Sequence, residues 1–440
     1  MIWYLGAILI MSVLIYSPST FHVYTAPKMY VFAVGVFGGF LFFASAWRGA
    51  LPWLLIGWIG YWSCLQLVFC CDYSTLFEIA LCVGWAFLVG AYLAPVQLLY
   101  MLSIAGALVA LIALAEFAGY GIGRGYWQDF GTLHFGKIQG RRPAACLGNP
   151  DVLGSFSAAM LPLAVALMFP FNALLALIGL VLSQARASWL AAGLPGVPLF
   201  SSYFWIRKDE ILQDHSLRER LKYYALTWKL IQERPWFGHG LGSFKFWAAR
   251  EWSSFPRLNH VHCEWLEVLH DGGILGVALW SAIIVQSLRT LWTAGRIEQA
   301  CALALGVLLI DGLFSLSLRV LPVQMLFWSF IGLAMRSDLS PITISVGIRC
   351  GLGLLLLAIP NAAILLMMAD YHHKQALKAI FAKQDIEAGL EKLLLVLRLN
   401  PWMTEARSSM ILLLEKMGHT DLADAQRQKL LMYEPYFYAR

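Results

Sequence analysis

Long apolar runs separated by short polar connections recur along most of the chain. Runs of this kind are long enough to cross a bilayer core of about 30 Å as helices, which rise about 1.5 Å per residue. Six runs precede a polar middle section and four follow it, at residues 2–15, 30–46, 51–69, 76–93, 97–114, 152–169, 274–285, 300–318, 321–335 and 343–368. The pattern predicts an all-α, polytopic membrane protein with about 10–12 membrane helices.

Composition supports this class. Of the 440 residues, 60% are hydrophobic and 13% are charged, and the mean hydropathy is +0.67. Soluble domains contain about half apolar and about a quarter charged residues, so an ordinary soluble protein is excluded. The formal net charge of +6 does not require a nucleic-acid partner, because a membrane protein accounts for it. We therefore expect the lipid bilayer as a partner and no nucleic acid.

The runs and the polar segments between them divide the chain into six predicted regions. In chain order these are N-terminal membrane helices at 1–118, an outer loop at 119–151, membrane helices with a short re-entrant segment at 152–206, a large outer loop at 207–261, C-terminal membrane helices at 262–368, and a helical tail at 369–440. Pro401 and Pro435 in the tail lie one tetratricopeptide period of about 34 residues apart, with a Gly418 turn between them. The tail is predicted to be tetratricopeptide-like and to bind a protein partner or the membrane domain, with an ordinary helical hairpin as the alternative.

Basic residues in the short loops predict the orientation in the membrane. Such residues favour the cytoplasmic side, and here they fall at alternate loops that agree with one another: Arg48, Arg289, Arg296, Arg336 and Arg349. The N-terminus is then cytoplasmic, whereas both middle loops and the tail lie outside.

The two outer loops are basic, which is opposite to the usual bias. Residues 119–150 carry one acid and four bases: Asp129 against Arg124, Lys137, Arg141 and Arg142. Long loops translocate regardless of charge, so these residues can be ordinary solvated charges. The alternative is a binding site for an anion that faces outward.

A histidine stands where the second outer loop meets the next apolar run. If the helix begins at His262, Gly273 and Gly276 lie within roughly 40° of its direction, which would place the histidine at a tight helix contact near the aqueous boundary. The acids of the segment would then lie on the opposite side of the helix: Glu264, Glu267 and Asp271.

Two motifs precede this histidine on the same loop. Arg220 lies about four helical turns before Pro235-Trp-Phe-Gly238-His-Gly240-Leu-Gly242-Ser-Phe, and His262 follows. This order resembles the O-antigen ligase and O-antigen polymerase superfamily, whose members have an arginine, a glycine-rich stretch, and a histidine spaced as here from two glycines. The departure is Cys263, where the family usually has Asn, Ser or Gln. The three glycines favour a tight turn over a phosphate-cradling loop, because no strand precedes them.

The resemblance extends upstream and covers most of the chain. Gly148-Asn149-Pro150-Asp151 is similar to the family's turn before a helix, with Asp151 in place of a final asparagine, and Asp151 is predicted to cap the helix that begins at residue 152. Arg186 matches the family's arginine at the outer end of a short helix, although Ala185 replaces the usual serine.

The resemblance implies transfer of a glycan from undecaprenyl diphosphate to an acceptor hydroxyl, on the periplasmic face of the bacterial inner membrane. The favoured acceptor is lipid A core, as in an O-antigen ligase. An O-antigen polymerase and a protein O-oligosaccharyltransferase of the same superfamily are alternatives. A lipid-linked sugar transporter is the alternative of another class, although paired repeats and deep ionisable residues do not stand out.

Arg186 and Arg220 are the predicted diphosphate ligands, because guanidinium groups bind phosphate with two-point hydrogen bonds and stay charged. His262 is the predicted general base. Further candidates for substrate binding are the basic residues of the first outer loop: Lys137, Arg141 and Arg142. The reaction is expected to invert the anomeric carbon and to need no metal and no cofactor. The eight cysteines show no zinc or disulfide spacing.

The number of membrane crossings between Arg186 and Arg207 differs from the pattern of the family. Between Arg186 and Arg207 the family generally has two crossing helices, whereas this chain has about twenty residues with Pro195 and Pro198. A re-entrant segment would keep Arg186 and His262 on one side. A single crossing would separate them, and a shortened, inactive relative is a further alternative.

Three more polar residues stand out. Asp311 lies inside an apolar run, where an acid is a functional candidate by default, and a structural ion pair with Arg319 is the competing hypothesis. His239 and His260 match no family position and are expected in surface or turn roles.

Overall fold

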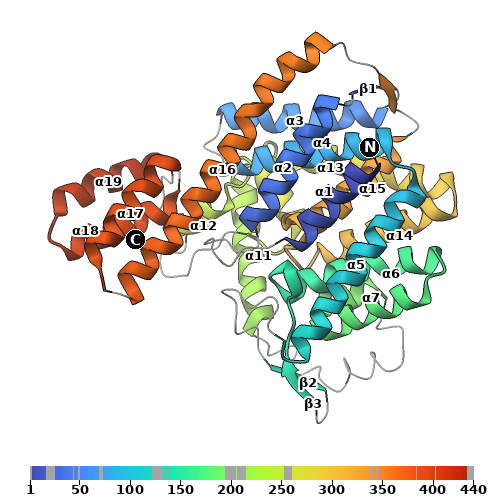
Figure 1. The fold of residues 1–440 in the computed structure, drawn as a ribbon, viewed down its shortest axis with the longest axis horizontal. Helices are drawn as coiled ribbons and strands as arrows, with labels where there is room; N and C mark the ends of the chain where they lie inside the picture. The colour runs from blue at the N-terminus through green and yellow to red at the C-terminus, as the bar shows by residue number, and fades with distance from the viewer. Residues whose placement is uncertain are drawn as a thin grey trace.

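Helices form most of the chain in the computed structural model (Figure 1). It describes residues 2–15, 25–42, 44–47, 50–68, 73–120, 132–135, 138–193, 205, 215–251, 260–336, 339–342, 346–382, 384–401 and 403–433. The helices before the large loop are α1 (Ile2–Leu14), α2 (Thr25–Phe42), α3 (Ala50–Val68), α4 (Tyr73–Tyr92), α5 (Pro95–Phe117), α6 (Pro150–Ala166), α7 (Pro170–Ser183) and α8 (Arg186–Ala191). The later helices are α11 (His215–Glu233), α12 (Phe244–Glu251), α13 (Glu264–Ala294), α14 (Arg296–Asp311), α15 (Leu321–Ala334), α16 (Val346–Ala382), α17 (Ile386–Leu399), α18 (Thr404–Lys416) and α19 (Thr420–Tyr433).

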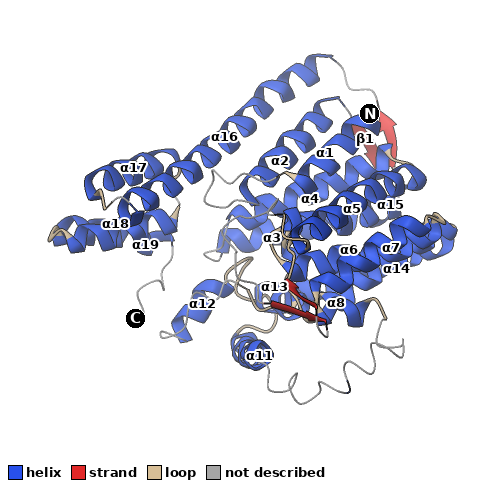
Figure 2. Ribbon diagram, turned by 60° about the horizontal axis from the view of Figure 1, so that its bottom comes forward, coloured by secondary structure: helices blue, strands red, loops and turns tan. Residues whose placement is uncertain are grey.

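Short strands and 3-10 turns complete the described fold. Strands β1 (Ala44–Trp47) and β4 (Leu339–Ile342) form one antiparallel pair, and β2 (Thr132–Phe135) and β3 (Ile138–Arg141) form another. Two single 3-10 turns are η1 (Ala145–Leu147) and η3 (Ser317–Arg319). The dominance of helices confirms the all-α prediction in its coarse form (Figure 2).

Each predicted apolar run overlaps a described helix, although the bounds differ, and one apolar helix had no run of its own. Helix α7 was not among the runs, because no polar stretch separates it from α6 in the sequence. The turn between them is made by Met168, whose φ of 55° lies in the left-handed region, and by Pro170 at the start of α7. Backbone geometry, and not a change of polarity, therefore ends α6.

Two of the described helices, α5 and α13, are long and apolar enough to cross a membrane by length and composition. The shorter apolar helices cover Trp3–Leu14, Ala50–Leu65, Glu78–Tyr92, Pro150–Ala166, Pro170–Ser183 and Leu321–Ala334.

One large apolar cluster joins helices α1 to α7 to α13, α14 and α15. Every residue of α15 is buried, as expected for a helix that is apolar on all sides. Trp280 of α13 stacks on both Trp58 of α3 and Phe327 of α15, with ring centroids 5.1 Å apart in each pair. Aromatic stacking thus fixes α13 against the two helices on either side of it.

The C-terminal helices form a second cluster. Helix α16 continues without interruption past residue 369 and leads to α17, α18 and α19, which lie together at the C-terminal end of the molecule (Figure 1). Ala369 and Ala376 of α16 share a core with Leu393 and Met410. The predicted domain boundaries, including the one at residue 369, and the likeness to tetratricopeptide repeats stay predictions.

Helix α13 is broken at Gly273, where φ is 62° and ψ is −165°. The glycine-rich stretch docks onto the break: the Ile274 N–H donates to the Pro235 carbonyl at 2.8 Å, and the Gly240 N–H donates to the Asp271 carbonyl at 2.8 Å. A Cβ on Gly273 would lie 2.4 Å from the Trp236 backbone. The glycine-rich stretch is thus a turn that packs against the helix, as favoured from the sequence.

The proposed helical stripe of His262, Gly273 and Gly276 is wrong. Helix α13 begins at Glu264, so His262 precedes it, and Gly273 interrupts the helical geometry that would align the three residues. The sequence pattern assumed one continuous helix, whereas the docked turn supplies alternative partners for the backbone at the break.

Replacing Gly273 with Ala is expected to destabilise the protein by at least about 1–3 kcal/mol, because this backbone region is essentially restricted to glycine and the new methyl would meet backbone atoms. Gly306→Ala is the matched control, since a Cβ there has no neighbour within 4 Å and alanine favours a helix. Thermal unfolding of the detergent-purified variants, followed by tryptophan fluorescence, measures the difference. Equal unfolding temperatures for the two variants would contradict the importance of the break.

Candidate functional site

The start of α6 forms one wall of the candidate site. Gly148 has a φ of 83°, and Asn149 caps the helix by accepting the Asp151 N–H at 2.8 Å on its side chain. Pro150 follows as the first helical residue, where the missing N–H has no cost. The prediction that Asp151 is the cap is therefore wrong, because the shorter turn through Asn149 starts the helix earlier. The Asp151 carboxylate is left available for other partners.

Two arginines converge on Asp151. Arg142 Nη2 lies 3.0 Å from Asp151 Oδ1, and Arg220 Nη2 lies 3.6 Å from Oδ2. Arg142 Nε also donates to the Ser183 carbonyl at 2.8 Å, at the end of α7. The side chains of Asp151 and of both arginines are partly exposed. The structure thus brings together Arg142 of the first predicted outer loop and Arg220 of the second.

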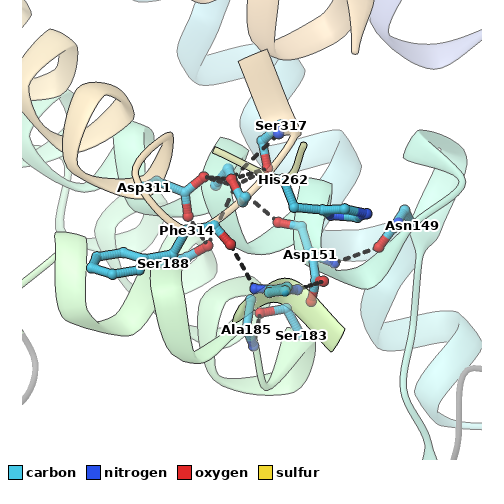
Figure 3. A network of polar contacts seen from close by, with 12 residues as sticks. Asn149, Asp151, Ser183, Ala185, Ser188, His262, Asp311, Phe314 and Ser317 are labelled. Carbon is cyan, nitrogen blue, oxygen red and sulfur yellow. Dashed lines mark hydrogen bonds and ion pairs between the residues drawn. The ribbon is translucent and has the colours of Figure 1, made fainter. Parts of the chain in front are cut away.

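Close to this cluster, the buried Asp311 carboxylate joins three segments of the chain (Figure 3). Ser155 Oγ of α6 donates to Oδ2 at 2.6 Å, and Ser188 Oγ of α8 donates to Oδ1 at 2.7 Å. Ser315 Oγ lies 2.5 Å from Oδ2, and Ser317 Oγ lies 2.6 Å from the Ser155 hydroxyl. The hydroxyls compensate the burial of the carboxylate.

The predicted ion pair of Asp311 with Arg319 does not form. Arg319 Nε instead donates to Glu264 Oε2 at 2.9 Å and lies 3.8 Å from Glu267 Oε1. Helix α14 ends at Asp311, and the following turn and η3 carry Arg319 toward the start of α13. The helical spacing on which the pairing rested is therefore absent.

Arg220 is held by the backbone beyond Asp311. Its Nη1 donates to the Phe314 carbonyl at 2.6 Å, which ties α11 to the turn after α14. Asp311, the last residue of α14, binds Ser188 of α8, and Phe314 three residues later binds Arg220. The start of α8 and Arg220 therefore lie at the same end of the helical part of the molecule, the end at which α14 stops. Arg186 is the first residue of α8, two residues before Ser188. The described residues therefore place both predicted diphosphate ligands at that end.

His262 lies on a short segment before α13 and has a φ of 63°, a conformation that is uncommon outside glycine. Its carbonyl accepts from the Tyr224 hydroxyl at 3.1 Å, and its ring stacks on Tyr223 with centroids 6.1 Å apart. Both tyrosines belong to α11, four and three residues after Arg220. Helix α11 therefore positions the arginine and the histidine together.

One buried acid, Glu267, holds the backbone that precedes His262. Glu267 accepts the Val261 N–H on Oε2 at 3.0 Å, and its Oε1 lies 2.8 Å from His260 Nδ1. His260 is thus a partner of the buried Glu267, and its predicted surface or turn role stays a prediction. Burial alone would lower the pKa of His260, but the Glu267 carboxylate outweighs burial and raises it. Cys263 occupies the cap position of α13 and packs in an apolar cluster with Leu226 and Phe244.

The surroundings of His262 keep its imidazole neutral. Burial lowers the pKa of His262 to about 4, with smaller contributions in the same direction from the positive charges of Arg220 and His260. Glu267 and Asp151 oppose this effect only partly. At neutral pH the imidazole therefore carries one free nitrogen lone pair that can accept a proton.

Some predicted site residues lie outside the described residues, or their side chains do. Lys137 is outside them, and Arg141 is described only as the last residue of β3. The predicted re-entrant segment is 188–206, of which residues 194–204 and 206 also lie outside. Sequence reasoning missed Asp151 as the partner of both arginines. The signal was present, because Asp151 departs from the asparagine that the family motif has at this position.

Glycine-rich backbone does not form an anion site here. The N–H groups of Gly240 and Gly242 donate to the carbonyl and the carboxylate of Asp271, at 2.8 and 2.9 Å. His239 stacks on His270, whose Nδ1 lies 2.9 Å from the Asp271 carboxylate, and both histidine side chains are buried. His239 is therefore a packing residue of the docked turn. In the part of the chain that the structure describes, no group of three or more His, Cys, Asp or Glu residues is placed to hold a metal ion; metal independence stays a prediction.

A helical body that gathers a neutral histidine and several arginines at one end fits the class of helical glycan-transferring proteins that the sequence resembles. Residues 199–281 match the family model described as O-Antigen ligase. The match includes Arg220, the glycine-rich stretch and His262, and it confirms the resemblance to the O-antigen ligase and polymerase superfamily. It supports a glycosyltransferase of that superfamily. No curated protein matches the chain.

Replacing Asp311 with Asn is expected to lower the free energy of unfolding by about 1–3 kcal/mol, since an amide cannot accept from all of these hydroxyls and leaves polar groups unsatisfied. Asp385→Asn is the matched control: Asp385 caps α17 by accepting the Ala388 N–H at 3.0 Å, and asparagine is an equally good cap. Thermal unfolding compares the two variants. An equal loss of stability in the control would contradict the stabilising role of the hydrogen bonds from Ser155, Ser188 and Ser315 to Asp311.

Proposed function

We propose that the protein is an extracytoplasmic glycosyltransferase that moves a glycan from undecaprenyl diphosphate to an acceptor hydroxyl. The favoured activity is that of an O-antigen ligase, which joins the glycan to lipid A core at the periplasmic face of the bacterial inner membrane. The observation that carries the proposal is a neutral His262 beside the guanidinium of Arg220, at the end of the helical body where Arg142 and the start of α8 also lie.

His262 acts as the general base. It accepts the proton of the acceptor hydroxyl while the acceptor oxygen forms a bond to the anomeric carbon. The bond from that carbon to the diphosphate oxygen breaks at the same time, and its electron pair leaves with the diphosphate. Attack from the face opposite the leaving group inverts the anomeric carbon. General-base assistance of this kind contributes a rate factor of about 10²–10⁴.

Arg220 and Arg186 bind the diphosphate and stabilise the negative charge that develops as it leaves. Arg142 belongs to the same group, because its guanidinium shares the Asp151 carboxylate with Arg220. The charge of the bound donor also affects His262. Two phosphate charges beside Arg220 offset the positive field that disfavours imidazolium, so donor binding raises the pKa of His262 toward neutrality, where a base is most effective.

Membrane embedding follows from the apolar helices together with the resemblance. The apolar helices would span or enter the bilayer several times, with a re-entrant segment at 188–206 so that Arg186 and α11 share one side. A tetratricopeptide-like tail would then lie in the periplasm and bind a protein partner. An O-antigen polymerase or a protein O-oligosaccharyltransferase would use the same chemistry on another acceptor.

A sugar transporter of the same donor is the competing function. A transporter needs neither a base nor bond cleavage, so a neutral histidine held next to an arginine has no part in it.

Expression in a strain that lacks its O-antigen ligase tests the proposed activity. We expect capped lipopolysaccharide on gels with the wild-type chain and uncapped lipopolysaccharide with His262→Ala, because removal of the base slows transfer by at least about 10². His419→Ala is the matched control, since His419 lies between α18 and α19 in the tail. Wild-type capping by the His262 variant, inserted at normal levels, would rule out its catalytic assignment; uncapped lipopolysaccharide with every chain would favour another acceptor or a transporter.

The pH dependence of kcat/KM is expected to reflect the low pKa of His262. Activity requires the neutral imidazole, so it falls as the pH drops through the pKa of the free enzyme, which is about 4. Arg220→Gln removes one of the positive charges that lower this pKa, and the acidic limb should move to higher pH. Arg220→Lys retains the charge and should leave the limb near its wild-type position. Both variants are expected to be slower. Identical limbs in the Gln and Lys variants would contradict the electrostatic link.

A further inference from the structure

Among the residues that the structure describes, Asp151 is the acidic side chain that forms ion pairs with both Arg142 and Arg220. Its two carboxylate oxygens face different arginines, Oδ1 at 3.0 Å from Arg142 and Oδ2 at 3.6 Å from Arg220. A carboxylate that bridges two guanidinium groups presents the same chemistry as one phosphate group of a diphosphate. The carboxylate thus stands where an anionic ligand of these arginines would bind.

The ion pairs of Asp151 with Arg142 and Arg220 are exposed enough for another anion to replace the carboxylate. The side chains of both arginines are 23% exposed and that of Asp151 is 40% exposed, so solvent and ligands reach the pairs. Partly exposed ion pairs contribute little to stability, and a ligand of higher charge can displace the carboxylate. Asp311, in contrast, is fully enclosed by serine hydroxyls and holds the helices together.

The backbone around Asp151 does not depend on its charge. The turn is held by Asn149, which accepts the Asp151 N–H, and by Pro150 and Gly148. The Asp151 carbonyl is 2.9 Å from the Ser155 hydroxyl, again a backbone contact. An asparagine at position 151 would keep these contacts, the side-chain size and an acceptor for Arg142, and would remove one negative charge.

We propose that Asp151 is a built-in competing anion, which occupies Arg142 and Arg220 in the free protein and exchanges with the diphosphate of the donor and of the released carrier lipid. This inference rests on the proposed function, since it concerns the ligand of the same arginines. The competition lowers the affinity for diphosphate. It matters most after transfer, because the free carrier diphosphate has one more ionisable oxygen than the glycosylated donor and binds the arginines more tightly. Return of the Asp151 carboxylate to the arginines then favours product release.

Binding of inorganic pyrophosphate to the purified full chain tests the sign of this effect. Asp151→Asn should bind pyrophosphate about tenfold more tightly than wild type at low salt, which corresponds to about 1.4 kcal/mol. Asp151→Ala should also bind pyrophosphate more tightly than wild type, and it replaces the asparagine variant in the test if that variant fails to fold. If Asp151 instead positions the arginines for the ligand, both variants bind more weakly. Unchanged or weaker binding overturns the proposal.

Matched variants separate competition from a general change of charge. Glu219→Gln removes a negative charge from α11 next to Arg220 in sequence, where Glu219 pairs with Lys222 at 2.7 Å, and should change binding less than about twofold. An equal gain in this control overturns the proposal. Combining Asp151→Asn with Arg142→Gln and Arg220→Gln should abolish the gain, because the arginines that Asp151 occupies are then absent; persistence of the gain also overturns it.

Product inhibition and ligand binding distinguish failure of this inference from failure of the proposed function. Asp151→Asn should be inhibited by undecaprenyl diphosphate at about tenfold lower concentration than wild type. If wild type binds pyrophosphate and Arg220→Gln does not, the diphosphate site stands and the Asp151 variants alone decide the inference. If pyrophosphate binds equally to wild type and Arg220→Gln, the arginine site itself is wrong, and the proposal is overturned together with it.

Discussion

Burial of the Asp311 carboxylate is the constraint on which the site depends. A buried charge without partners is costly, so donors must reach it from surrounding segments. Ser155 from α6 and Ser188 from α8 supply them, and Ser315 supplies another from its own chain segment. These contacts bring α6, α8 and the end of α14 together. Ser155 lies one helical turn after Asp151, and Asp311 lies three residues before Phe314, whose carbonyl accepts from Arg220. A structural acid in the core thus fixes α6 beside the turn that holds Arg220.

Much of the helical framework could be predicted from apolar runs, and the candidate site could be predicted in its residue types but not in its geometry. The run at 274–285 gave no sign that α13 breaks at Gly273, because the break depends on a turn some 35 residues earlier in the chain. His262 was assigned to the helix for the same reason. The pairing of Arg319 also failed, since helical spacing says nothing of the turn that redirects the chain after Asp311. In each case the local geometry depends on contacts between segments that are distant in the sequence.

Departures from the family motif were more informative than its matches. Asn149, which matches the motif, caps α6, so the side chain at position 151 is not needed as the helix cap. The asparagine usual there is neutral, whereas Asp151 brings a charge into contact with two arginines. Cys263 fills another departing position and packs among apolar residues, where a thiol behaves as a small hydrophobic group. One departure therefore alters the electrostatics of the site, and the other alters the packing beneath His262.

The electrostatic balance of the site follows from distance and burial. Burial and Arg220 affect the pKa of His262 most strongly and Asp151 affects it least, so the imidazole is neutral but weakly basic. A bound diphosphate would change this balance in the direction that catalysis needs, because its charge would lie beside Arg220 and oppose the field that lowers the pKa. The arginines proposed to bind the donor would thereby make the base stronger only when the donor is present. Coupling of this kind needs no moving segment, since it requires only that Arg220 lies close to both the ligand and the imidazole.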